Sequence, residues 1–152
     1  MALFSRKVDY ALLILSYLHH RPEGGCAREI SERFRLKPAF AANVLKLLCR
    51  RGLVASRRGV YGGYVLAHPA EQIALCDLLD QLGEPFHLAE CNAPPGCCME
   101  QTCPVRGAVA DLDERIRSML RGVTLADLCR ERLAQEPGRF GLSVVLPEEV
   151  DA

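Results

Sequence analysis

Four of the eight cysteines of this chain lie in one short segment, Leu88–Arg106, which reads LAECNAPPGCCMEQTCPVR. Three of them, Cys91, Cys97 and Cys103, are evenly spaced, with five residues between each pair. The intervening residues include Pro, Gly, Asn and other small or polar types, which favour irregular backbone over helix or strand. Thiolates held close together in such a loop are the ligands that zinc and iron–sulfur clusters prefer. Any fold for this chain must therefore present three regularly spaced thiols on a loop.

The length of 152 residues suits one domain, or a small domain with a dimerising extension. No apolar run approaches the roughly 18 residues that span a bilayer. The first residues, MALFSRKVDY, lack the shape of a signal peptide, because an acidic residue closely follows the two basic ones. We therefore expect a cytoplasmic protein without a membrane partner. Cysteines in that reducing compartment are more often metal ligands or redox sensors than structural disulfides.

The zero net charge conceals two halves of opposite sign. Residues 1–65 hold 12 Lys and Arg against 4 Asp and Glu, a balance of +8. Residues 66–152 hold 7 against 15, a balance of −8, and the two halves sum to zero. This asymmetry indicates that the first half meets a polyanion. Chance clustering of solvated charges is the alternative interpretation.

The first half has the apolar spacing of three consecutive helices. Helical periodicity predicts a helix over 5–19 and a shorter one over 27–34. A third helix is expected to begin at Pro38 and to end before Gly52. Its buried stripe would be formed by Ala41, Val44, Leu45 and Leu48. Two short helices, a turn and a third helix with a polar, basic outer face are typical of a helix-turn-helix.

A hairpin is predicted directly after these helices. The runs Leu53–Arg57 and Tyr64–Ala67 have strand character, and Gly59 and Gly62-Gly63 lie in the connection. Helix-turn-helix followed by a hairpin is the winged-helix arrangement. The fold class we expect is mostly α with a small β-hairpin wing, a winged helix-turn-helix joined to a long dimerisation helix.

The second half is expected to hold a helix over 71–82, the cysteine loop, and then a longer helix. In that longer helix the apolar residues step by four, three, four and three, and they are Val105, Val109, Leu112, Ile116 and Met119. Such a seam is typical of a dimer interface, and an ordinary amphipathic helix on its own domain is the alternative. A short closing helix should begin with Thr124 as its N-cap.

The expected domain organisation follows from these elements. It comprises a DNA-binding domain over 1–82, a cysteine-rich loop over 83–104, a dimerisation helix with the closing helix over 105–134, and a tail over 135–152. The other four cysteines, Cys26, Cys49, Cys76 and Cys129, lie singly in helical segments and are interpreted as buried small hydrophobic residues.

Three motifs together resemble the bacterial IscR/NsrR/CymR-type regulators, the Rrf group of winged-helix transcription factors. The wing RRGVYGGYVL (Arg57–Leu66) is similar to the R-G-x-x-G-G-Y-x-L wing of that family. The cysteine triplet has the spacing of its iron–sulfur members, and TLADL (Thr124–Leu128) is similar to the motif that closes the family's dimer helix. The resemblance covers roughly residues 3–130.

The resemblance implies a set of cluster ligands. The three loop cysteines bind a cluster in the family, and the fourth ligand differs between branches. One branch uses a histidine three residues after the third cysteine, but Arg106 occupies that position here. Another uses an aspartate near the start of the first helix of the partner subunit, and Asp9 matches it. The implied ligands are thus Cys91, Cys97, Cys103 and the partner subunit's Asp9, on a [4Fe–4S] cluster, with [2Fe–2S] the lesser option.

Two of these residues have a second interpretation. Asp9 could instead be an ordinary surface carboxylate at the start of a helix, where the helix dipole favours negative charge. Cys98 adjoins Cys97 and could replace it, or act as an extra redox thiol.

The expected DNA contacts lie on the third helix and the wing. They are Lys37, Ala39, Phe40, Asn43, Lys46, Arg50, Arg57, Arg58, Gly59, Tyr61, Gly62, Gly63 and Tyr64. The basic side chains would neutralise phosphates, while Asn43 could contact an adenine and Phe40 a thymine methyl. Family members often carry a serine–tyrosine pair and a glutamate here, where this chain has Ala39, Phe40 and Ala42. The operator sequence therefore stays open.

The function we expect is a dimeric DNA-binding transcriptional regulator, in its simplest form a repressor. Through a bound iron–sulfur cluster it would sense redox state, nitric oxide, or iron and iron–sulfur status. The alternative is a cluster-free thiol-switch regulator of the same fold. An enzyme, zinc-structured or redox, is disfavoured because the chain has no C-x-x-C pair, no Ser/His/Asp grouping and no phosphate loop before a helix. The expected partners are an operator duplex and a second copy of the chain, with no small-molecule substrate identified.

Overall fold

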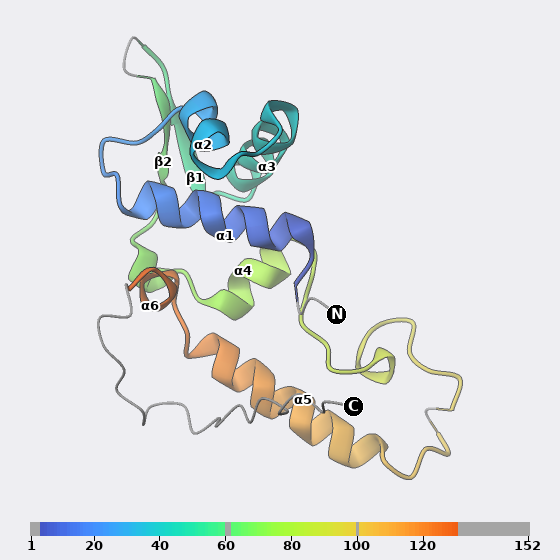
Figure 1. Ribbon diagram of the computed structural model, residues 1–152. Helices are drawn as coiled ribbons and strands as arrows, with labels where there is room; N and C mark the ends of the chain where they lie inside the picture. Colours follow the sequence, from blue (N-terminus) through green and yellow to red (C-terminus); the bar gives the residue numbers. More distant parts are fainter. Residues whose placement is uncertain (1–3, 60–61, 100, 131–152) are drawn as a thin grey trace, which may run out of the picture.

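A computed structural model of the chain describes residues 4–59, 62–99 and 101–130. The elements follow one another along the chain as in Figure 1. They are α1 (Arg6–His19), α2 (Ala27–Phe34), α3 (Pro38–Arg50), β1 (Val54–Arg57), β2 (Gly63–Leu66), the 3₁₀ helix η1 (Ala70–Gln72), α4 (Leu75–Gln81), the 3₁₀ helix η2 (Glu90–Asn92), α5 (Arg106–Arg121) and α6 (Leu125–Cys129).

The first three helices confirm the prediction from periodicity, and local signals set their ends. Ser5 caps α1, its hydroxyl oxygen accepting a hydrogen bond from the Val8 amide at 3.4 Å. Pro38 begins α3, where its fixed φ suits the first helical position and its missing N–H costs nothing. Gly52, just beyond the end of α3, has a φ of 73°, which glycine adopts without the penalty of a Cβ.

Cys26 corrects one part of the sequence interpretation. It is only half-buried, and it caps α2 rather than filling the core. Its sulfur accepts a hydrogen bond from the Glu29 amide at 3.4 Å, and the Glu29 carboxylate accepts one from the Cys26 amide at 2.8 Å. This reciprocal pair satisfies two amides at the helix start, the role usually taken by serine or threonine.

The hairpin pairs antiparallel, in a register that runs from Val54 opposite Leu66 to Arg57 opposite Gly63. A third backbone segment joins its edge. The Gly25 amide donates to the Tyr64 carbonyl at 3.0 Å, and the Tyr64 amide donates to the Gly25 carbonyl at 2.9 Å. The wing is therefore attached to the turn before α2, and the expected winged helix-turn-helix is confirmed.

Helix α1 lies at the centre of the core. In Figure 1 it runs between α2, α3 and the hairpin on one side and α4 and α6 on the other. It contacts α3, α6 and β2 through side chains that are fully or almost fully buried. The core includes Val8, Ala11, Ile14, Leu15, Ile30, Leu45, Leu48, Leu78, Leu79 and Leu125.

The prediction of a single helix over 71–82 is wrong. The chain forms η1, then an extended pair of residues, Ile73 and Ala74, and only then α4. The reason is a backbone pairing with a distant segment. The Leu75 amide donates to the Val123 carbonyl, and the Leu125 amide donates to the Ile73 carbonyl, both at 2.8 Å. This pairing ties the far end of α5 back to the winged-helix unit.

Helix α5 extends beyond this core, with the cysteine segment at its N-terminal end (Figure 1). The closing helix α6 has the expected N-cap, Thr124, which forms a capping box with Asp127. Residues 131–134 of the expected dimerisation unit and the expected tail over 135–152 lie outside the described residues. Within the part of the chain that the structure describes, no helix is long and apolar enough to cross a membrane.

Candidate nucleic-acid interface and cysteine segment

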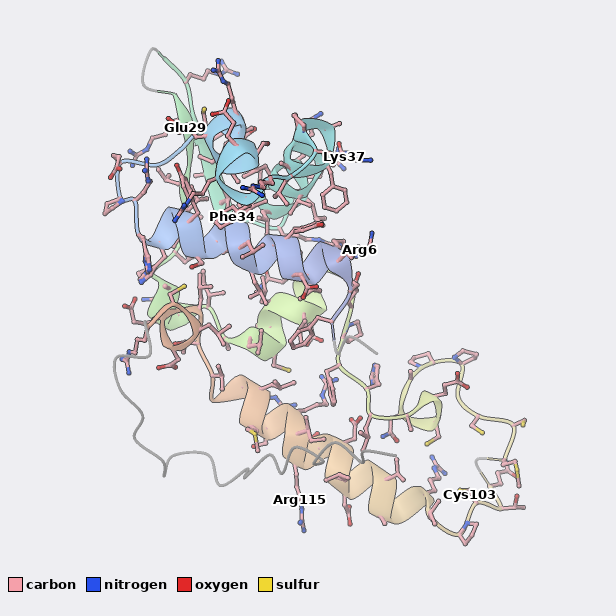
Figure 2. All side chains as sticks on the ribbon, viewed as in Figure 1. Arg6, Glu29, Phe34, Lys37, Cys103 and Arg115 are labelled. Carbon is pink, nitrogen blue, oxygen red and sulfur yellow. The ribbon has the colours of Figure 1, made fainter. Side chains whose placement is uncertain are left out.

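The outer face of α3 is polar and accessible. Lys37, Asn43, Lys46 and Arg50 are all exposed, on the side of the helix opposite the buried residues Ala41, Val44, Leu45 and Leu48. Figure 2 shows Lys37 pointing away from the core at the start of the helix. None of these three cations has an ion pair within the described residues. The face is thus free to bind an anionic partner.

Phe40 is held on this face by an aromatic neighbour. Its ring lies edge-on against Tyr10 of α1, with the ring centroids 5.0 Å apart, and the side chain is 36% exposed. Such edge-to-face pairs favour one orientation of the ring. Phe40 therefore offers a fixed apolar edge beside Ala39, which is also exposed.

The wing presents a second basic surface. Arg57, Arg58 and Gly59 are exposed at the end of β1. The connection closes where the Gly62 amide donates to the Gly59 carbonyl at 2.8 Å. Tyr61, the other residue expected at the tip, lies outside the described residues.

The two remaining wing positions lie nearer the core. Gly63 and Tyr64 are half-buried, and the Tyr64 side chain packs against the hydrophobic core. Tyr64 is thus placed more to hold the wing through Gly25 than to extend beyond it.

The four cysteines of the loop are free thiols with different exposure. Cys91, Cys97 and Cys103 are half-buried, whereas Cys98 is exposed. Figure 2 places Cys103 at the start of α5, away from the winged-helix unit. Among the described residues, no three His, Cys, Asp or Glu side chains are close enough together to hold a metal ion. The structure therefore does not bring the predicted ligands together within one chain.

The donor set nevertheless suits a soft metal centre. The thiols sit in a segment whose only regular element, within the described residues, is the short η2 helix. Five residues of extended chain span about 17 Å, so the backbone between neighbouring cysteines can fold back to gather them. Asp9 is exposed in the first turn of α1, and its carboxylate is accessible to a second molecule.

The seam residues of α5 are largely uncovered. Val105, Leu112 and Met119 are 57%, 48% and 47% exposed, while Val109 and Ile116 are half-buried. Among the residues of α5, only Asp113 is buried. The helix thus keeps an apolar stripe that its own chain does not cover.

Sequence reasoning missed the polar anchors of the cysteine segment. Asp113 and Arg117 lie off the predicted seam, but both contact backbone groups just before the cysteines. The Asp113 carboxylate accepts a hydrogen bond from the Leu88 amide, and the Arg117 guanidinium donates to the Phe86 carbonyl at 2.9 Å. The available signal was helical spacing, since Asp113, Arg117 and the partly buried Leu120 share one face.

A further ion pair fixes the chain between α4 and the cysteine segment. The Lys7 ammonium lies 2.7 Å from the Glu84 carboxylate. Partial burial raises the pKa of Glu84, but hydrogen bonds from Lys7 and Ser5 and the Lys7 charge outweigh it. The pKa of Glu84 is therefore lowered, and the pair ties the start of α1 to the residues after α4.

The single cysteines divide into two kinds. Cys76 and Cys129 are buried, as interpreted from the sequence, whereas Cys49 is half-buried. Burial raises the pKa of the Cys49 thiol, and burial together with the Asp80 charge raises the pKa of Cys76. A raised pKa keeps a thiol protonated and unreactive, so these two are poor candidates for redox chemistry.

Comparison with known proteins identifies the family. The model of the Rrf2 family, described as an iron-dependent transcriptional regulator, matches residues 4–131. A protein of Aquifex aeolicus named as an HTH-type transcriptional regulator is 31% identical over 130 residues, covering 83% of this chain and 90% of that protein.

Solved structures agree with this match. CymR of B. subtilis, described as its global cysteine regulator, has a TM-score of 0.70 and 27% identity, covering 85% of this chain and 97% of CymR. IscR of T. potens has a TM-score of 0.64 and 26% identity, covering 88% of this chain and 93% of IscR. CymR is thus described as a regulator, and the A. aeolicus relative as a transcriptional regulator. The chain belongs to the Rrf2 family of winged-helix transcriptional regulators.

Proposed function

We propose that this regulator contacts the bases of duplex DNA with the outer face of α3 and binds the adjacent phosphate backbone of the DNA with its wing. The observation that carries the proposal is the exposed face of α3, polar and basic and without ion-pair partners among the described residues. Lys46 and Arg50, with Arg57 and Arg58 on the wing, would neutralise phosphates, which supplies affinity without sequence preference. Asn43 can pair with an adenine edge in the major groove.

The experiment separates these two roles. Duplexes selected from a random pool are titrated by fluorescence anisotropy at several salt concentrations. Lys46→Gln should weaken binding to all sequences and make the slope of log affinity against log salt shallower by about 0.9 for each copy of Lys46, or about 1.8 for the proposed dimer. Asn43→Ala should relax the sequence preference and leave that slope unchanged. If both variants bind as the wild type does, α3 is not the reading helix.

The uncovered stripe on α5 supports assembly with a second copy of the chain. Val105, Leu112 and Met119 expose apolar surface along one side of the helix, and a helix-turn-helix dimer matches the two-fold symmetry of its operator. Leu112→Glu should convert the dimer to monomers in sedimentation equilibrium. The matched control is Arg115→Ala, an exposed residue of the same helix that points away from the chain in Figure 2.

A cluster held between the two copies is the sensor in this proposal. Cys91, Cys97, Cys103 and the partner subunit's Asp9 would hold a [4Fe–4S] cluster, with [2Fe–2S] as the lesser option. When bound, the cluster supplies a centre whose oxidation or loss responds to oxygen, nitric oxide and iron supply. The support is the spacing and partial exposure of the thiols, the family's description as iron-dependent, and the accessible carboxylate at the start of α1.

The change in DNA affinity that loss of the cluster must cause can be estimated. Changing operator occupancy from nearly complete to nearly absent requires about 5.5 kcal/mol of differential affinity. A displaced winged-helix unit no longer reaches all of its phosphates, and phosphate binding carries a large share of the affinity. In the simplest arrangement the protein is a repressor. Its two winged-helix units bind the two halves of the operator together only when the cysteine segment is ordered.

Anaerobic purification tests the cluster directly. The wild type should be brown and should contain iron and acid-labile sulfide. Cys91→Ala should be colourless. Asp9→Ala should lose iron faster than Asp77→Ala, a matched control because Asp77 is also an exposed carboxylate in the first turn of a helix. An Asp9→Ala protein with a wild-type cluster removes Asp9 from the ligand set.

A cluster-free thiol switch is the second candidate, favoured by one observation. Cys98 is exposed beside the half-buried Cys97, and accessible thiolates are the ones that oxidise. In this case mild oxidation of iron-free protein should change DNA affinity, and Cys98→Ser should abolish the change. An iron-free protein whose affinity ignores oxidation would eliminate this candidate.

A further inference from the structure

Helix α5 contacts its own chain through buried polar groups. Asp113 is 7% exposed, and among the described residues it is the one charged side chain that is buried. Its carboxylate accepts a hydrogen bond from the amide of Leu88, 25 residues earlier in the chain. Burying a carboxylate is costly unless it is hydrogen-bonded, so this position is held by a specific contact rather than by general packing.

Arg117 lies one helical turn after Asp113 and acts on the same stretch of backbone. One of its guanidinium nitrogens donates to the Phe86 carbonyl at 2.9 Å, and another lies 3.8 Å from the carboxylate of Asp80 in α4. Its side chain is 19% exposed. Two side chains of α5 therefore hold an amide and a carbonyl at the entrance of the cysteine segment, and one of them also reaches the winged-helix unit.

Beyond this entrance, the short helix η2 lies against α5. The backbone hydrogen bonds of the cysteine segment are local, such as Asn92 to Ala89, Gly96 to Ala93 and Thr102 to Met99. Its exit is fixed because Cys103 precedes the start of α5 by only three residues. Both ends of the segment thus depend on α5, and at the entrance the contact is made by the Asp113 and Arg117 side chains.

We propose that Asp113 and Arg117 form a latch that positions the entrance of the cysteine segment against α5. The two are positioning residues that bind no ligand themselves, and the inference rests on the proposed cluster function. By fixing where the segment starts relative to where it ends, the latch sets how closely Cys91 can approach Cys103. Opening the latch would remove no cysteine from the chain, but it would let Cys91 move away from Cys103 and so weaken the binding of a shared metal centre.

Hydrogen exchange on the metal-free protein tests the latch without any cluster. Asp113→Leu removes the acceptor, and the peptide containing Leu88 should exchange about tenfold faster, equivalent to ~1.4 kcal/mol. Asp113→Asn keeps an acceptor oxygen and should stay close to the wild type. The matched control is the exposed pair on the same helix, Glu114 and Arg121, whose charged groups are 2.7 Å apart. Glu114→Gln should leave this exchange unchanged.

A second variant covers the case in which Asp113→Leu does not fold. Arg117→Met keeps the length of the side chain and removes its donors, and it should accelerate exchange over 86–88 while α1 and α3 remain protected. Wild-type exchange in the folded Asp113→Leu protein, or in Arg117→Met, overturns the latch.

Iron retention then tests what the latch does. In anaerobic protein challenged with a chelator, Asp113→Leu and Arg117→Met should lose iron about tenfold faster than the wild type or Glu114→Gln, again equivalent to ~1.4 kcal/mol. If the wild type binds no iron, the cluster function fails, and the exchange experiment alone decides whether the latch exists. If the wild type binds iron and the latch variants release it at the same rate, the positioning role is refuted.

Discussion

Replacing Gly63 by alanine should detach the wing from the helical part of the molecule. Strand β2 runs beside Gly25, and Tyr64 makes two backbone hydrogen bonds to that residue, 2.9 and 3.0 Å long. A Cβ on Gly63 would lie 2.7 Å from the Gly25 carbonyl oxygen and 3.0 Å from its carbon. Real Cβ atoms do not approach other atoms so closely, and backbone cannot rotate away as a side chain can. Alanine therefore forces the two backbones apart.

The structure sets the size of this effect. A backbone hydrogen bond contributes a net ~0.5–1.5 kcal/mol, so losing two lowers the free energy of unfolding by about 1–3 kcal/mol. For a domain of this length each kcal/mol shifts Tm by about 2–4 °C, which gives a total of about 2–12 °C. Thermal unfolding followed by circular dichroism measures the shift. Gly107→Ala is the matched control, because that helical glycine has open space around its Cβ position and alanine there should stabilise by ~0.5–1 kcal/mol.

DNA binding should change in a defined way in the same variant. Arg57 and Arg58 move with the displaced wing, and the salt slope falls by about 0.9 for each phosphate that is no longer neutralised. Fluorescence anisotropy across a salt series would show a shallower slope for Gly63→Ala and a wild-type slope for Gly107→Ala. A Gly63→Ala protein that keeps both the wild-type Tm and the wild-type slope would refute the reasoning, since the pairing with Gly25 would then not hold the wing.

Three further changes test the core, a cap and an ion pair. Leu45→Ala, at a fully buried position of α3, should cost about 2–5 kcal/mol in urea unfolding because it leaves a cavity. Thr124→Ala removes the hydroxyl that accepts from the Asp127 amide at 3.2 Å and should cost about 0.5–2 kcal/mol by the same measurement. The lowered pKa of Glu84 contributes stability that is present above its ordinary value of 4.5 and is lost as pH falls through the folded-state pKa. Lys7→Met should flatten this part of the profile, measured as urea unfolding from about pH 6 to 3.

The winged-helix part could be predicted because its signals are local. Apolar periodicity indicates the buried face of α3, and Pro38 and Gly52 mark its ends through backbone preferences that need no distant partner. The hairpin is predictable for the same reason, since glycines punctuate two strand-like runs. What the sequence does not reveal is the pairing of Tyr64 with Gly25, which joins residues far apart in the chain.

Non-local contacts explain the errors. The segment over 71–82 has helical periodicity throughout, but Ile73 and Leu75 give their backbone groups to Leu125 and Val123 instead. The residue type of Cys26 favours the interior, whereas its position before α2 gives it the role of a cap. In both cases a backbone group needed a partner, and the partner decided the local structure.

The cysteine segment shows the limit of sequence-based reasoning most clearly. Its spacing identifies the ligand type, because thiol chemistry is a property of each residue. The arrangement of the thiols in space depends on contacts between residues and cannot be read from residue types. Among the described residues, the backbone-to-backbone hydrogen bonds of the segment are local and the thiols are not gathered within one chain. The residues that hold the segment, Asp113 and Arg117, are polar and lie in a helix that sequence patterns assign by its apolar seam.

Helix α5 has two different faces, an exposed apolar one and a polar one that binds the backbone of its own chain. A helix that completed only its own domain would turn its apolar residues inward, because apolar burial is the main stabilising term. Here Leu112 and Met119 face outward, while Asp113 and Arg117 face the chain and bind its backbone. Hydrogen bonds are directional, so the inward face fixes the direction of the helix, and the exposed outward face is the one we propose for association. If α5 pairs with a second copy of the chain as proposed, the two side chains that hold the cysteine segment would also set where the partner's winged-helix unit lies.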